Sequence, residues 1–169
     1  MIKIGIDVGS TTAKLVAVDE NDNLLFSKYE RHNAKAKETI LSFLKELLSE
    51  IGDKDISVRI TGSIGMGISE KCSLPFVQEV VAAAKAIQKD YSHVTSMIDI
   101  GGEDAKVVFF NDAEATDLRM NGNCAGGTGA FIDQMAIILG VNIDELNQLA
   151  MNATQVYPIA SRCGVFCKT

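Results

Sequence analysis

The sequence lacks the features that would place it at a membrane or on a nucleic acid. No run of apolar residues is long enough to cross a bilayer, and the first residues, Met1 to Ile6, are typical of a strand rather than of a secretory signal. The formal net charge is −6, so there is no excess of positive charge to hold a nucleic acid or an anionic membrane surface. We therefore expect a cytoplasmic protein without either partner.

A Cys-x-x-Cys pair is also absent, which disfavours a self-contained zinc site. Cysteines of a cytosolic chain are more often free, metal-bound or redox-active than joined in disulfides. His32 and His93 stand alone in polar surroundings, and we expect both to be ordinary surface residues. The chain has four cysteines: Cys72, Cys124, Cys163 and Cys167.

The length of 169 residues suits one ordinary domain or two small lobes, and 47% hydrophobic residues suffice for a core. Chains normally stop in frayed polar residues. Here residues 161–169 form a small, apolar, cysteine-bearing segment. We therefore expect the chain to be a fragment of a longer protein.

The strongest organisational signal is an internal repeat of strand, glycine turn and strand. Asp7-Val8-Gly9-Ser10-Thr11-Thr12-Ala13-Lys14 and Asp99-Ile100-Gly101-Gly102-Glu103-Asp104-Ala105-Lys106 occupy equivalent places in two half-repeats. Apolar runs and polar turns predict strands at 2–8, 13–18 and 24–29 in the first half, and at 95–100, 105–110 and 114–118 in the second.

Helices are predicted between and after these strands. Asn33 is the predicted cap of a first helix, which a strand at 57–61 and a loop at 62–67 follow. Asn142 is the predicted cap of a short last helix, with Glu145 in the capping-box position. The buried faces expected of three helices are Ile40, Leu44, Leu47, Leu48 and Ile51; Val77, Val80, Val81, Ala84 and Ile87; and Phe131, Ile132, Met135, Ile138 and Leu139.

Each hairpin carries groups that suit a phosphate and a metal ion. An Asp lies at the end of the first strand, glycine lies in the turn, and a Lys lies in the second strand. Backbone N–H groups and hydroxyls can surround a phosphate while the Asp holds a hydrated Mg²⁺. Turn geometry alone also explains one such hairpin. Two hairpins at matching positions favour a clamp on the β- and γ-phosphates of a nucleotide.

Residues 121–129, Asn-Gly-Asn-Cys-Ala-Gly-Gly-Thr-Gly, form a glycine-rich turn before a predicted helix. The glycines let backbone N–H groups approach a ligand, and the start of a helix favours an anion. Such a turn suits a phosphate, a thiolate, or a thiolate bound to a metal cluster. Because the two hairpins already supply a phosphate site, we favour a role for the thiol of Cys124.

Together these motifs resemble a known family. The hairpins resemble the phosphate-1 and phosphate-2 motifs of the superfamily of acetate and sugar kinases, Hsp70 and actin. With the cysteine turn and Ser161-Arg162-Cys163-Gly164-Val165-Phe166, they resemble the activators of 2-hydroxyacyl-CoA dehydratases, the family that includes the benzoyl-CoA reductase ATPase subunits (BadF/BadG/BcrA/BcrD-type ATPases). The resemblance covers the whole chain. Thr61-Gly62-Ser63 and residues 75–79 look closest to a longer multidomain branch.

The resemblance implies an α/β, actin-like ATPase (ribonuclease H-like) fold with mixed sheets and flanking helices. It implies a first ATPase lobe at 1–93 and the start of a truncated second lobe at 94–169. The implied function is ATP hydrolysis that drives one low-potential electron from reduced ferredoxin or flavodoxin to a 2-hydroxyacyl-CoA dehydratase or a related CoA-ester reductase. The implied cofactors are ATP or ADP, Mg²⁺, and a [4Fe-4S] cluster shared between the two subunits of a homodimer.

The matching motifs also imply the site residues. Cys124 and Cys163 match the cluster ligands, two from each subunit. Asp7 and Asp99 match the catalytic residues that hold Mg²⁺ through water, and Glu103 is expected beside them as a third catalytic carboxylate, either on Mg²⁺ or facing solvent. The residues expected around the phosphates are Gly9, Ser10, Thr11, Thr12, Lys14, Gly101, Gly102, Asp104 and Lys106.

Two positions depart from the family pattern. Glu103 stands where the short activators usually carry Gln, and Cys167 stands where a small non-cysteine residue is usual, so Cys167 is either inert or a competing ligand. Cys72 has no supporting context and is expected to be structural or free. Two other functions stay open: a redox-inert small-molecule kinase on the same fold, and a non-catalytic activator-like domain kept for assembly. A kinase would not need Cys124 and Cys163.

Overall fold

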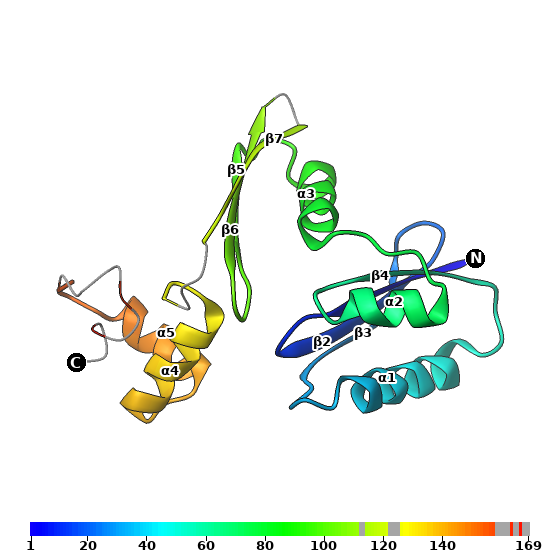
Figure 1. Cartoon of the computed structure of the whole chain (residues 1–169), viewed down its shortest axis with the longest axis horizontal. Helices are drawn as coiled ribbons and strands as arrows, with labels where there is room; N and C mark the ends of the chain where they lie inside the picture. The colour runs from blue at the N-terminus through cyan, green and yellow to red at the C-terminus, as the bar shows by residue number, and fades with distance from the viewer. Residues whose placement is uncertain (112–113, 122–125, 158–162, 164–165, 167–169) are drawn as a thin grey trace. The chain divides into compact units, whose positions relative to one another are not determined.

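The computed structural model describes residues 1–111, 114–121, 126–157, 163 and 166. The chain divides into two compact units, Met1–Lys89 and Asp90–Thr169, each with its own sheet and helices (Figure 1). Within the described residues, no helix is both long and apolar enough to cross a membrane.

The first unit is built on a four-stranded mixed sheet. Its strands are β1 (Ile2–Val8), β2 (Thr12–Val18), β3 (Leu24–Arg31) and β4 (Ile56–Thr61), in the order β3-β2-β1-β4. Strand β1 is antiparallel to β2 and parallel to β4. Every second residue of β1 is buried, which is the pattern of a strand with one face on a core. The strands predicted from the sequence are thus confirmed here.

Helix α1 (Ala36–Ile51) packs on that buried face and completes the core. Its buried residues are Ile40, Phe43 and Leu47, whereas Leu48 is 61% exposed, so the predicted apolar stripe was wrong at that position. The helix also begins later than predicted. Asn33 has a φ of 48°, a left-handed conformation outside the helix, because the chain turns there between β3 and α1.

Helix α2 (Gly65–Cys72) begins inside the segment that was predicted to be a loop. A Cβ at Gly65 would lie 2.9 Å from Cγ2 of Ile60, so the absence of a side chain lets α2 lie close to β4. Tertiary packing therefore outweighs the low helix propensity of glycine. After α2, Phe76 forms a single parallel bridge with Ile60, and α3 (Glu79–Asp90) follows.

The second unit has a three-stranded antiparallel sheet in the order β5-β6-β7. Its elements are β5 (Ser96–Ile100), β6 (Ala105–Asn111), β7 (Glu114–Met120), α4 (Gly129–Leu139) and α5 (Ile143–Met151). The capping box of Asn142 and Glu145 at the start of α5 is confirmed. The predicted inward face of α4 was wrong for Ile132, Ile138 and Leu139, which are 39%, 59% and 58% exposed, because α4 buries Ala136 instead.

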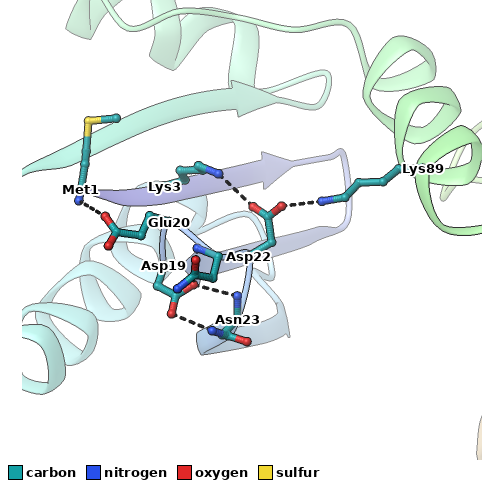
Figure 2. A network of polar contacts seen from close by, with 8 residues as sticks. Met1, Lys3, Asp19, Glu20, Asp22, Asn23 and Lys89 are labelled. Atoms are coloured by element: carbon teal, nitrogen blue, oxygen red, sulfur yellow. Dashed lines mark hydrogen bonds and ion pairs between the residues drawn. The ribbon is translucent and has the colours of Figure 1, made fainter.

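An exposed polar network closes the β2–β3 turn (Figure 2). Asp19 accepts hydrogen bonds from the backbone N–H groups of Asn21 and Asn23 at 2.8 and 2.9 Å. Asp22 accepts from Lys89 at 2.6 Å and from Lys3 at 2.9 Å. These two bonds, with that from Lys89 the stronger, lower the pKa of the Asp22 carboxyl from 3.8 to about 2. The network therefore ties α3 to β1 through the turn.

Candidate functional site

The first hairpin pairs a carboxylate with an amine across two strands. Asp7 lies directly opposite Lys14 in the β1–β2 register, and Nζ of Lys14 donates to Oδ2 of Asp7 at 2.6 Å. Both side chains are partly exposed, with 20% exposure for Asp7 and 39% for Lys14. The Gly9 N–H donates to the Thr12 carbonyl at 3.0 Å and closes the turn. The carboxylate therefore has a fixed orientation at the mouth of the turn.

The second hairpin repeats this arrangement. Asp99 lies opposite Lys106 in the β5–β6 register, and the Gly101 N–H donates to the Asp104 carbonyl at 2.8 Å. The side chain of Lys106 is only 7% exposed. Its Nζ lies 2.8 Å from Oδ2 of Asp104 and 3.8 Å from Oδ2 of Asp99. The register of the Asp and the Lys is thus repeated, whereas the closest ion pair differs: Lys14 contacts Asp7, and Lys106 contacts Asp104 more closely than Asp99.

In each unit, the start of a helix is bonded to the carbonyl groups of the hairpin. In the first unit the Ile64 N–H, at the start of α2, donates to the Val8 carbonyl at 2.9 Å. In the second, the N–H groups of Gly129 and Ala130 donate to the carbonyls of Gly101 and Gly102 at 2.8 and 3.1 Å. These first amides of α4 are therefore occupied by the protein. They support the turn rather than form an anion site of their own.

Two oxygen atoms beside the first hairpin are buried without a hydrogen-bond partner. They are Oδ1 of Asp7 and Oγ1 of Thr61, which are register partners in the parallel β1–β4 pair. Both residues line a cavity of about 320 Å³, together with Lys14 and Arg59. An unsatisfied buried polar atom costs about 1–3 kcal/mol. Each oxygen is therefore a candidate ligand for a water or a hydrated cation.

Gly62 closes this corner of the site. Its φ is 91°, and a Cβ there would lie 2.6 Å from Oδ1 of Asp7 and even closer to the Val8 carbonyl. Only glycine adopts this conformation readily and leaves room for the carboxylate. Thr61 and Gly62 were not predicted to belong to the site. Their place at the carboxyl end of a strand parallel to β1 is the signal that marks them.

The remaining predicted site residues fall into three groups. Ser10 and Thr11 lie in the first turn, where their hydroxyl oxygens are 3.5 Å apart and partly buried. Glu103 is exposed in the second turn. Cys163 is partly buried, whereas Cys124 and Cys167 lie outside the described residues. The described part of the chain contains no group of three or more His, Cys, Asp or Glu residues placed to hold a metal ion.

His32 was predicted to be a surface residue, and this prediction was wrong, since its exposed fraction is 4%. The chain turns inward after β3, and the imidazole lies behind the first hairpin turn, with Nε2 3.1 Å from the Gly9 carbonyl oxygen. No pattern in the sequence marked it.

Comparison with known proteins identifies the family. The family model described as "BadF/BadG/BcrA/BcrD ATPase family" matches residues 4–169. The chain belongs to this ATPase family. The resemblance to this family is therefore confirmed.

Characterised relatives extend the match. The chain is 29% identical over 168 residues to the (R)-2-hydroxyglutaryl-CoA dehydratase activating ATPase of Acidaminococcus fermentans, covering 98% of this chain and 64% of the relative. It is 31% identical over 182 residues to the 2-hydroxyisocaproyl-CoA dehydratase activator of Clostridioides difficile, covering 100% and 64%. The chain thus spans about two thirds of the length of these relatives.

A solved structure supports the fold. The activator of the 2-hydroxyisocaproyl-CoA dehydratase from Clostridium difficile with bound ADPNP matches with a TM-score of 0.86 and 30% identity, over 99% of this chain and 63% of that one. The expected α/β, actin-like ATPase fold, with mixed sheets and flanking helices, is confirmed.

Proposed function

We propose that this chain is the nucleotide-binding part of an ATPase that activates a 2-hydroxyacyl-CoA dehydratase or a related CoA-ester reductase. The observation that carries the proposal is the pair of Asp–Lys hairpins, each with a glycine in its turn and a backbone carbonyl bonded to the start of a helix. The relatives named as dehydratase activators, one of them with bound ADPNP, support the same role.

In this proposal the hairpins bind the phosphates and Mg²⁺ of ATP. Mg²⁺ prefers oxygen ligands and keeps several waters, which suits the unpartnered Oδ1 of Asp7 beside Oγ1 of Thr61. The ion would neutralise charge on the phosphates. Asp99 and Glu103 would supply the carboxylates of the second hairpin. The turn residues Gly9 to Thr12 and Gly101 to Asp104 would surround the phosphates.

We propose that Lys14 and Lys106 have a role besides their expected place around the phosphates. Both amines already contact the carboxylates of their own hairpins. A lysine in such a pair fixes the rotamer of the carboxylate and partly neutralises its charge. We therefore assign these lysines to holding Asp7, Asp99 and Asp104 in place, with any phosphate contact made after the pair opens.

The electron-transfer part of the proposal rests on the cysteines and the family. Cys124 and Cys163 would supply two thiolates from each of two subunits, which together complete the four ligands of a [4Fe-4S] cluster. Held by these thiolates, such a cluster would supply one-electron transfer between reduced ferredoxin or flavodoxin and the dehydratase. The proposed ATPase lobes are 1–93 and the beginning of a second at 94–169.

The decisive experiment uses the full-length protein, purified without oxygen. We expect a brown homodimer with about four iron atoms per dimer, ATPase activity, and an EPR spectrum that changes when nucleotide binds. The Cys124→Ala/Cys163→Ala double variant should lose the iron and keep nucleotide binding, and Cys72→Ala is the matched control. A colourless, iron-free monomer would overturn the proposal. Full ATP-dependent turnover in the double variant would support a redox-inert kinase instead.

A further inference from the structure

His32 lies directly after β3, and its side chain is almost completely buried against the first hairpin turn. Its backbone N–H donates to the Thr11 carbonyl at 3.2 Å. Its ring nitrogen Nε2 lies 3.1 Å from the Gly9 carbonyl oxygen. A carbonyl oxygen only accepts hydrogen bonds, so Nε2 carries the hydrogen. The same residue therefore holds two carbonyl groups of the turn.

These bonds orient the amides on the other side of the same peptide units. In a trans peptide the C=O and the following N–H point in opposite directions, and the described residues include no cis peptide bond. With the Gly9 carbonyl held by the imidazole, the Ser10 N–H is directed away from His32. With the Thr11 carbonyl held by the His32 backbone, the Thr12 N–H is directed away as well.

The other ring nitrogen shows that His32 is not a simple core residue. Nδ1 is buried and has no hydrogen-bond partner. With the hydrogen on Nε2, Nδ1 is a hydrogen-bond acceptor. Burying this acceptor without a partner costs free energy that no hydrogen bond offsets. A Leu or Phe would fill the same space without this cost. The bond from Nε2 to the turn is therefore what the imidazole provides.

We propose that His32 is a positioning residue that aims the Ser10 and Thr12 amides at the phosphates of the nucleotide. This inference rests on the proposed function, since it requires that the first turn bind phosphate. The amides act on the ligand directly, and His32 acts through them. Because anion binding by backbone amides depends on their direction, loss of the ring N–H weakens binding even where the fold persists.

The test compares three variants of the full-length protein by calorimetric titration with Mg²⁺–ATP. His32→Leu, which keeps apolar volume and lacks a donor, should bind about tenfold more weakly, equal to about 1.4 kcal/mol. His32→Gln, whose amide can donate to the Gly9 carbonyl, should recover most of the affinity. His93→Leu, at the exposed second histidine, is the matched control and should bind like the wild type.

The outcomes separate this inference from the proposed function. Wild-type protein that does not bind ATP would overturn both. Wild-type protein that binds, with His32→Leu binding equally well, would overturn the role of His32 alone. If His32→Leu does not fold, ¹⁵N NMR of the wild-type imidazole decides: a hydrogen on Nε2 and nucleotide-induced shifts of the Ser10 and Thr12 amides support the inference. A ring without a hydrogen on Nε2, or unshifted amides, would refute it.

Discussion

Lys14 and Asp7 face each other across the β1–β2 pair, with Nζ of the lysine 2.6 Å from Oδ2 of the aspartate. Lys106 and Asp99 hold the same register positions in β5 and β6. The two pairs differ in burial: the Lys106 side chain is 7% exposed and that of Lys14 is 39% exposed. Because of this difference, we expect the two lysines to contribute unequally to the stability of the fold, although they occupy equivalent positions in the sequence repeat.

Replacement of each lysine by Met should expose that inequality. Lys106→Met removes a buried ammonium and leaves Asp99 and Asp104, which are 25% and 37% exposed, without their cation, so we expect a loss of about 1–3 kcal/mol. Lys14→Met breaks a partly exposed pair and should cost about 1 kcal/mol or less. Urea unfolding of both variants checks the order. Equal losses would show that the second hairpin does not depend on burial of its lysine.

Thr61→Val should separate a ligand role from a structural one. Oγ1 of Thr61 has no hydrogen-bond partner, so a methyl group in its place should leave stability unchanged or slightly raised. We expect the variant to need about tenfold more Mg²⁺ for half-maximal ATP binding, with metal-free nucleotide binding unaltered. Magnesium titrations at fixed ATP measure this. A destabilised variant with normal Mg²⁺ dependence would assign Thr61 to the fold instead.

Gly62→Ala should destabilise the first unit. The left-handed φ of 91° and the nearby carbonyl of Val8 both oppose a Cβ, so the loss should exceed about 1 kcal/mol. Gly67→Ala is the control, since nothing lies within 4 Å of its Cβ position inside α2. That change should stabilise by up to about 1 kcal/mol. Thermal unfolding of both variants gives the comparison, and a neutral Gly62→Ala would refute the strain at this position.

The pH dependence of stability should include a contribution from Asp22. Hydrogen bonds from Lys89 and Lys3 lower the pKa of its carboxyl in the folded protein to about 2, below the ordinary 3.8. A depressed folded-state pKa means that the carboxylate stabilises the fold above pH 3.8, and that this contribution disappears as the pH falls towards 2.

Unfolding free energies of the wild type and Asp22→Asn, measured from pH 6 down to about pH 2, check this contribution. The difference between the two should shrink across that range and also with added salt, since the site is exposed. Asp53→Asn, at another exposed carboxylate, is the control. A difference independent of pH would exclude the ion pairs as its source.

Much of the fold could be predicted because local signals agree with it. Alternation along Ile2 to Val8 and the glycine turns define both hairpins, and Asn142 with Glu145 defines the start of α5. The sequence alone could not show which of Phe43 and Leu48 is buried, because both positions fit an apolar stripe. The packing of α1 on β2 buries Phe43 and leaves Leu48 exposed. The start of α2 depends on close packing against Ile60, which is a tertiary effect.

The sequence predicted which kinds of residue belong to the candidate site, but it did not predict how these residues are arranged in space. The motifs name Asp7 and Lys14, but the cross-strand register is what joins them in an ion pair. Thr61 lies at the site because β4 pairs in parallel with β1, which joins segments more than fifty residues apart. His32 lies at the site because the chain turns inward after β3, and no local sequence pattern predicts that turn.

The bonds from Gly129 and Ala130 to the second glycine turn have a mechanical consequence. At 2.8 and 3.1 Å, neither bond survives a separation of roughly 1 Å more. A movement of the turn that keeps both bonds would therefore move the first residues of α4 with it. If that movement were a rotation, the displacement would grow along the 11 residues of α4 and be largest at Leu139.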